Sequence, residues 1–99
     1  MKSKNKLILV TGCAGFIGYH ICSKLIKLNL NILGVDNINN YYDTDLKKER
    51  LALLKKNTNF FFKKINIVNI KSIEKIFILY KPKYVIHLAA QAGVRLSFD

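Results

Sequence analysis

The sequence contains few acidic residues, so its net charge is strongly positive. It also contains few arginines. Six acidic residues stand against 17 basic ones, which gives a formal net charge of +11 at pH 7. A charge of this size is compatible with binding to nucleic acid or to an acidic membrane. However, Arg50 and Arg95 are the only arginines, and the lysines are scattered along the chain. Because arginine is the usual reader of bases and phosphates, we do not expect a nucleic-acid partner.

Long apolar runs and metal-binding clusters are also missing. No run approaches the ~18–20 apolar residues that a membrane-spanning helix needs. The apolar stretch before Cys13 covers only residues 7–10, whereas a secretory signal needs ~7–15 apolar residues. Cys13 and Cys22 have no companion cysteine or histidine at the spacing of a metal site. These absences predict a cytoplasmic protein with reduced thiols, no metal and no membrane partner.

The remaining composition is that of a small folded domain. Its 99 residues are 51% hydrophobic and 11% aromatic, which is enough for one compact core. Segments of strand character alternate with segments of helical periodicity along the whole chain. This alternation is typical of an α/β protein in which helices cover both faces of a parallel sheet. We therefore expect one domain over residues 1–99.

The expected strands cover residues 7–11, 31–35, 60–65 and 84–88, and the expected helices cover residues 16–28, 46–56 and 70–80. Asp45 and Asn69 are candidate N-caps of the second and third helices, and Pro82 ends the third. Four residues form the expected apolar stripe of the first helix: Ile17, Ile21, Leu25 and Leu28. Right-handed crossovers then give four strands in the order 3-2-1-4.

A glycine-rich segment after the first strand is the most informative motif. Gly12, Gly15 and Gly18 stand three residues apart, between a buried strand and an amphipathic helix. Such a turn presents bare backbone amides at a helix N-terminus, which favours a pyrophosphate. Gly12 permits the tight turn, Gly15 lets the phosphates approach the backbone, and Gly18 lets the helix pack closely on the strand. Because the commoner spacing is Gly-x-Gly-x-x-Gly, the motif alone is weak evidence.

An acidic residue at the end of the second strand strengthens this interpretation. Asp36 is placed to accept hydrogen bonds from the ribose hydroxyls of an adenosine. A carboxylate at this point also repels a 2′-phosphate, so we expect NAD rather than NADP. The alternative is a surface turn, for which Asp36-Asn37 is ordinary chemistry. Together, the turn and the acid predict a three-layer α/β domain that corresponds to one half of a Rossmann-type dinucleotide-binding fold.

Three segments carry a family resemblance. VTGCAGFIG, GVDNINNYYDTDLKKERL and VIHLAAQAGVRLS follow one another between residues 10 and 97. They resemble the extended short-chain dehydrogenase/reductases, the family of NAD-dependent nucleotide-sugar epimerases and dehydratases. The Tyr-Tyr-Asp segment over residues 41–43 and the Ala-Gly-Val-Arg segment over residues 92–95 are narrower signals. These two segments look most like those of the UDP-glucuronate 4-epimerases.

This resemblance implies NAD as cofactor and a set of residues that bind it. The backbones of Phe16 and Ile17 would donate to the pyrophosphate, and Asp36 and Asn37 would hold the ribose. Asn66 would meet the adenine where the family usually has Asp, and the lost charge would weaken binding by ~1 kcal/mol. The full implied set is Gly12, Gly15, Phe16, Ile17, Gly18, Asp36, Asn37, Asn66, Ile67, Leu88, Ala89 and Ala90.

Several of these residues have a plainer interpretation. The alternative for Asn66 is a turn residue at a strand end. The resemblance implies that Arg95 lies on the side of a UDP-sugar substrate, and the alternative for Arg95 is a solvated surface side chain. We interpret His87 as a hydrogen-bonded core residue rather than a catalyst, and His20 as a helix residue without a role. The tyrosines at 41–42 are expected to cover the second helix. Six lysines are expected to form a solvated face: Lys47, Lys48, Lys55, Lys56, Lys63 and Lys64.

The catalytic pair of the family is absent. In Tyr-x-x-x-Lys the lysine lowers the pKa of the tyrosine, whose phenolate takes a sugar proton while NAD takes the hydride. The residues four positions after the five tyrosines are Ser23, Asp45, Leu46, Tyr84 and Leu88. We therefore expect no catalytic residue in this chain and no activity from it alone.

Two interpretations of the function follow from this absence. The chain is the NAD-binding segment of a 4-epimerase without its substrate-binding part, as a truncated gene product or as half of a split enzyme. Alternatively, it is a complete, non-catalytic dinucleotide-binding or interaction module. In either case the strand over residues 84–88 is an exposed apolar edge, so we expect self-association through it.

Overall fold

The computed structural model describes residues 6–38 and 44–88. Strands and helices alternate strictly along the chain, which confirms the predicted α/β class. The elements are β1 (Leu7–Thr11), α1 (Phe16–Lys27), β2 (Asn31–Asp36), α2 (Thr44–Lys55), β3 (Phe60–Lys64), α3 (Ile70–Tyr80) and β4 (Tyr84–His87). Within these described ranges, no helix is long and apolar enough to cross a membrane.

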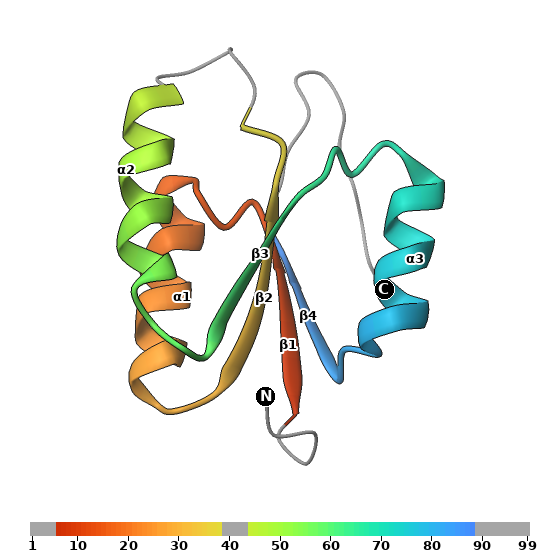
Figure 1. Ribbon diagram of the computed structural model, residues 1–99, viewed down its shortest axis with the longest axis horizontal. Coiled ribbons are helices and arrows are strands. Elements are labelled where there is room, and N and C mark those ends of the chain that lie inside the picture. Colours follow the sequence, from red (N-terminus) through yellow and green to blue (C-terminus); the bar gives the residue numbers. More distant parts are fainter. Residues whose placement is uncertain (1–5, 39–43, 89–99) are drawn as a thin grey trace.

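The four strands form one parallel sheet in the order β3-β2-β1-β4, as predicted. Helices α1 and α2 lie side by side on one face of the sheet, and α3 lies on the other (Figure 1). The chain therefore crosses from one face to the other between β3 and β4. This reversal leaves β1 and β2 in the centre of the sheet.

The core lies on both sides of these two central strands. Every residue of β1 and β2 is buried, because helices cover both faces of the sheet and each strand has a neighbour on both edges. Side chains alternate between the faces along β1. Ile8 and Val10 pack towards α1 and α2, whereas Leu7 and Leu9 pack towards Ile76 of α3.

Both cysteines belong to the core beneath α1. Cys13 and Cys22 are buried and free, and they pack in the same cluster as Ile26 and Leu54. Burial raises the pKa of Cys22 to about 12 and the pKa of Cys13 further still. The two side chains therefore behave as small apolar groups at neutral pH.

The apolar stripe predicted for α1 was wrong in part. Ile17 and Leu28 are 60% and 65% exposed, and the buried residues of α1 are instead Gly18, Cys22 and Ile26. This face begins at Gly18 because only a residue without a side chain fits against the turn at Gly12. The contact rotates the buried face by one residue, or about 100°, from the predicted stripe.

The predicted helix caps were right for α3 and wrong for α2. Asn69 Oδ1 accepts a hydrogen bond from the backbone N–H of Ser72 at 3.2 Å, and α3 ends at a left-handed Lys81. Helix α2 begins at Thr44, so Asp45 lies inside its first turn rather than at the cap. Its negative charge there still complements the positive end of the helix.

Candidate functional site

Backbone hydrogen bonds connect the turn after β1 to the end of β2. The backbone N–H groups of Gly12 and Cys13 both donate to the carbonyl oxygen of Val35, at 2.8 and 3.2 Å. Leu88, just after β4, donates to the carbonyl oxygen of Thr11 at 3.1 Å. Because the strands are parallel, their carboxyl ends meet at this same edge of the sheet, where ligands of α/β proteins bind.

Two of the three motif glycines are required by the protein itself. Gly12 has a φ of 73°, a left-handed conformation that residues with side chains rarely adopt. A Cβ on Gly18 would lie 2.0 Å from the carbonyl oxygen of Gly12. These two positions therefore need glycine for the turn and for the close packing of α1, as the motif predicts.

Gly15 is different, because no side chain of the described residues fills the space beside it. Its φ is −72°, an ordinary value, and a Cβ there would meet only the carbonyl oxygen of Gly12, at 3.4 Å. A contact of that length is normal. The absence of a side chain at Gly15 thus leaves open space at the start of α1, which suits the close approach of an external group.

In the part of the chain that the structure describes, no side chain caps the N-terminus of α1. Gly15 is the N-cap and makes no side-chain cap, and the first turn holds no acidic residue. The amides of the first helical residues have no acceptor within a helix. They carry the positive end of the helix dipole, and this arrangement favours an anion. The side chains of Phe16 and Ile17 are largely exposed at this end.

Asp36 points towards this turn. Its carboxylate is buried, with only 3% of the side chain exposed. Oδ2 accepts a hydrogen bond from the backbone N–H of Ala14 at 3.1 Å, and Oδ1 accepts one from Ile38 at 2.9 Å. The acid of β2 and the glycine turn of β1 are thus in direct contact, so the turn and the acid form one site.

Two cations of α2 reach the same site. Lys47 Nζ lies 3.3 Å from Asp36 Oδ1, and only 15% of the Lys47 side chain is exposed, so its assignment to a solvated face was wrong. Arg50 donates to the carbonyl oxygen of Ala14 at 3.1 Å, and its guanidinium lies 5.8 Å from the ring centroid of Phe16.

The roles of these cations were missed at the sequence level, although a signal was present. Lys47 and Arg50 are three residues apart and so share one face of α2. Both belong to the segment Leu46 to Leu51 that contributed to the family resemblance. The spacing indicates a common direction for the two side chains, but it does not reveal the contact with Asp36.

Four other predicted residues lie at or near the strand ends. Asn37 follows β2 and is half-buried, and Leu88 donates its N–H to Thr11 Oγ1 at 2.9 Å. Asn66 Oδ1 accepts from the N–H of Val68 at 3.1 Å, so its carbonyl acceptor serves the local turn. Ile67 is half-buried beside it. Their predicted contacts with a cofactor stay predictions.

The hydrogen bond predicted for His87 is present, whereas the lack of a role for His20 stays a prediction. His87 Nδ1 lies 2.8 Å from Thr11 Oγ1, across the pair β1 and β4. Burial lowers the pKa of His87, which favours its neutral form. His20 is exposed on α1, with its ring 4.6 Å from that of Phe16 in an edge-to-face contact. Ala89, Ala90, Arg95 and the tyrosines at 41–42 lie outside the described residues.

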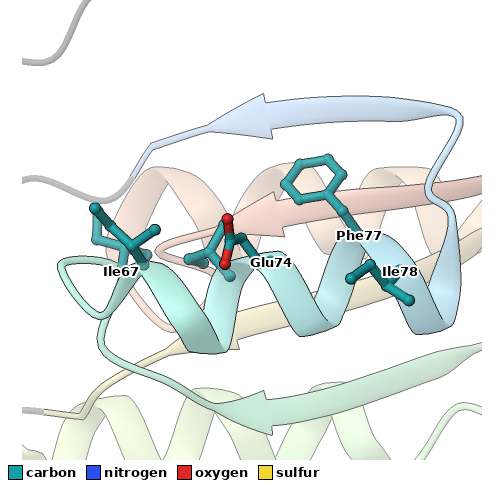
Figure 2. A pocket seen from close by; sticks show the side chains of 6 residues that line it. Ile67, Glu74, Phe77 and Ile78 are labelled. Atoms are coloured by element: carbon teal, nitrogen blue, oxygen red, sulfur yellow. The ribbon is translucent and has the colours of Figure 1, made fainter.

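An apolar groove of about 490 Å³ lies elsewhere, along the exposed side of α3 (Figure 2). Its lining is aliphatic and aromatic apart from one carboxylate. The lining residues are Ile67, Ile70, Ile73, Glu74, Phe77 and Ile78. Since α3 and α1 cover opposite faces of the sheet (Figure 1), the groove is separate from the glycine turn. Residues 6–38 and 44–88 contain no group of three side chains that could hold a metal ion.

The strand order, the bare start of α1 and the acid at the end of β2 define a Rossmann-type, dinucleotide-binding class of protein. Comparison with known proteins then narrows this class. Residues 9–99 match the family model described as GDP-mannose 4,6 dehydratase. The chain therefore belongs to the family of NAD-dependent epimerases and dehydratases, as its sequence motifs suggested.

Individual relatives agree with the family. The chain is 50% identical to a UDP-glucuronate 4-epimerase of Thermodesulfobacterium geofontis over 92% of its length and 28% of the relative. It is 48% identical to the protein CapI of Staphylococcus aureus over 93% of its length and 27% of the relative. The chain thus spans little more than a quarter of the length of each of these two relatives.

A solved structure shows the same fold. The UDP-glucuronic acid 4-epimerase of Bacillus cereus, in complex with UDP-glucuronic acid and NAD, superimposes with a TM-score of 0.74 at 35% identity. The match covers 94% of this chain and 29% of that enzyme.

Proposed function

We propose that this chain is the NAD-binding part of a nucleotide-sugar 4-epimerase of the UDP-glucuronate 4-epimerase type, acting in the cytoplasm. The observation that carries the proposal is the contact between Ala14 and Asp36. It brings a buried carboxylate against an uncapped helix N-terminus. A diphosphate and a neighbouring ribose need an uncapped helix N-terminus and a carboxylate side by side.

Each part of the dinucleotide has a residue suited to it. The backbones of Phe16 and Ile17 receive the pyrophosphate, and the open space at Gly15 admits it. Asp36 and Asn37 hold the adenosine ribose. The adenine lies near Asn66 and Ile67, and the cofactor passes beside Leu88, Ala89 and Ala90. NAD, when bound, supplies the hydride acceptor and donor of the epimerase reaction.

The sugar chemistry lies outside what this chain provides by itself. The 99 residues contain no Tyr-x-x-x-Lys pair, so no group is available to take the proton from a sugar hydroxyl in the manner of the family. Arg95 is the residue that we assign to the side of a UDP-sugar. The isolated chain binds NAD and does not turn over a substrate.

The missing pair also favours a second candidate, a non-catalytic dinucleotide-binding or interaction module. The two candidates make the same prediction for NAD and differ in what accompanies the chain. Reading the coding sequence beyond the codon of Asp99 for a Tyr-x-x-x-Lys pair, in any frame, distinguishes them. A pair found there supports the epimerase segment, and its absence supports the module.

Isothermal titration calorimetry with NAD tests the binding function common to both. We expect the wild-type chain to bind NAD and Asp36→Ala to weaken binding by a few kcal/mol at most, since hydrogen bonds to a charged acceptor contribute about 1.5–3 kcal/mol. Glu49→Ala is the matched control, because Glu49 is an exposed acid on α2. A wild-type chain that is folded and binds no NAD would contradict the proposal.

A further inference from the structure

We infer that Lys47, rather than Asp36 alone, sets how this site treats the 2′-position of the adenosine ribose. The inference rests on the proposed function, because it concerns the same dinucleotide. An acid at the end of β2 favours NAD over NADP if its negative charge faces the ribose unopposed. In this structure that charge is paired.

The carboxylate of Asp36 is already largely occupied. A carboxylate offers about four lone-pair positions. The N–H of Ala14, the N–H of Ile38 and the ammonium of Lys47 contact it at 3.1, 2.9 and 3.3 Å. Room is left for about one more donor, fewer than the two hydroxyls of a ribose can supply.

Lys47 is placed to serve the second hydroxyl. Its ammonium carries three N–H donors, and the contact with Asp36 Oδ1 uses one of them. Because Nζ lies 3.3 Å from the acceptor oxygen, a ribose that donates to Asp36 comes close to the ammonium as well. In NAD, Asp36 accepts from one hydroxyl and Lys47 donates to the oxygen of the other.

The pair of Lys47 and Asp36 also changes how strongly the site repels the 2′-phosphate of NADP. The charges of Lys47 and Asp36 cancel, and both side chains are mostly buried, with 15% and 3% exposed, so solvent screens their effect on a nearby phosphate weakly. The ammonium offsets the repulsion that the carboxylate alone would exert. The site therefore disfavours NADP less than a bare acid would, and the discrimination depends on Lys47.

Competition calorimetry, in which NADP displaces NAD, measures the ratio of the two dissociation constants. We expect Lys47→Met to raise the ratio of the NADP to the NAD constant about tenfold or more, because removing the cation leaves the carboxylate unopposed. Lys47→Arg should keep the wild-type ratio, since it keeps the charge. Lys48→Met is the matched control, because Lys48 is the exposed neighbour on α2, and it should change neither constant.

A second variant tests the inference if Lys47→Met fails to fold. Asp36→Asn leaves the ammonium without its partner, so we expect it to weaken NAD binding and to lower the ratio about tenfold. Equal weakening of both ligands in Lys47→Met, or an unchanged ratio in either variant, would overturn the inference while leaving the proposed function standing. Absence of NAD binding by the wild type would overturn both.

Discussion

Gly18 sits so close to Gly12 that a Cβ on Gly18 would lie 2.0 Å from the carbonyl oxygen of Gly12 and 2.9 Å from its carbonyl carbon. Both atoms are backbone, so no flexible side chain can move aside. The contact holds the first turn of α1 against the end of β1. It makes Gly18 the residue on which the packing of this helix depends.

Gly18→Ala should therefore destabilise the fold. Overpacking of this kind costs about 1–3 kcal/mol, and more where backbone must shift, which for a domain of this size lowers the Tm by roughly 4–8 °C for each kcal/mol. Thermal unfolding followed by circular dichroism measures the change. Lys24→Ala, on the exposed side of the same helix, is the control. An unchanged Tm for Gly18→Ala would show that the close contact is not structural.

Gly15→Ala should separate binding from stability. The added methyl group meets only an ordinary contact of 3.4 Å, and alanine at an N-cap costs about 1 kcal/mol or less relative to glycine. We expect a Tm within a few degrees of the wild type and a loss of NAD affinity of at least about tenfold, since the methyl group occupies the space proposed for the pyrophosphate. Calorimetry with NAD gives the affinity. Undiminished binding would mean that the phosphates do not pass over Gly15.

The stability of the fold should fall in mild acid because of His87. Burial lowers the pKa of His87 below its usual 6.5, while the unfolded chain keeps the usual value. As the pH falls below 6.5, the unfolded state takes up the proton first. The contribution of this group to stability is therefore fully present above that pH and is lost below it.

Urea unfolding at about pH 7.5 and about pH 5.5 measures this dependence. We expect the free energy of unfolding to fall less for His87→Asn than for the wild type over this range. His20→Asn is the matched control, because it removes an exposed histidine. Identical pH dependence in all three proteins would rule out His87 as the source.

Self-association through β4 is a further prediction. Within the described sheet β4 pairs on one side only, with β1, and Tyr84 and Val85 on it are 49% and 45% exposed. An open apolar edge of this kind pairs readily with another strand. Sedimentation velocity over a range of concentrations should show species larger than the monomer.

Val85→Lys should shift that distribution towards the monomer, because a charge on an edge strand opposes pairing. Val68→Lys is the matched control, since Val68 is also exposed, at 57%, but lies outside the strand. A wild-type chain that sediments as a monomer at every concentration would refute the prediction.

Local signals in the sequence were sufficient for most element boundaries. Helix α3 was predicted over its observed range because Asn69 caps its start with a side-chain oxygen and Pro82, which lacks an N–H, prevents its continuation. The limits of β2, β3, β4 and α1 differ by one residue, and α2 begins two residues before its predicted start. The strand order followed from the handedness of the crossovers, which needs no side-chain detail.

Orientation and contact between elements could not be predicted in the same way. The buried face of α1 is set by the contact of Gly18 with Gly12, and periodicity alone placed it one residue away. The role of Lys47 depends on the distance between α2 and the end of β2. Both the orientation of α1 and the contact of Lys47 with Asp36 depend on residues distant in the sequence. They could therefore be read only from the three-dimensional structure.

Because Val35 accepts from Gly12 and Cys13, and Asp36 accepts from Ala14, the last two residues of β2 carry the loop that leaves β1. The turn after β1 and the end of β2 therefore depend on each other's backbone position. Replacing residues 35–36 by a segment whose backbone takes a different course would displace the turn over residues 12–14 as well. A redesign that replaces the end of β2 as a segment must therefore replace the turn over residues 12–14 with it, whereas single side-chain changes leave the hydrogen bonds to the Val35 carbonyl oxygen in place.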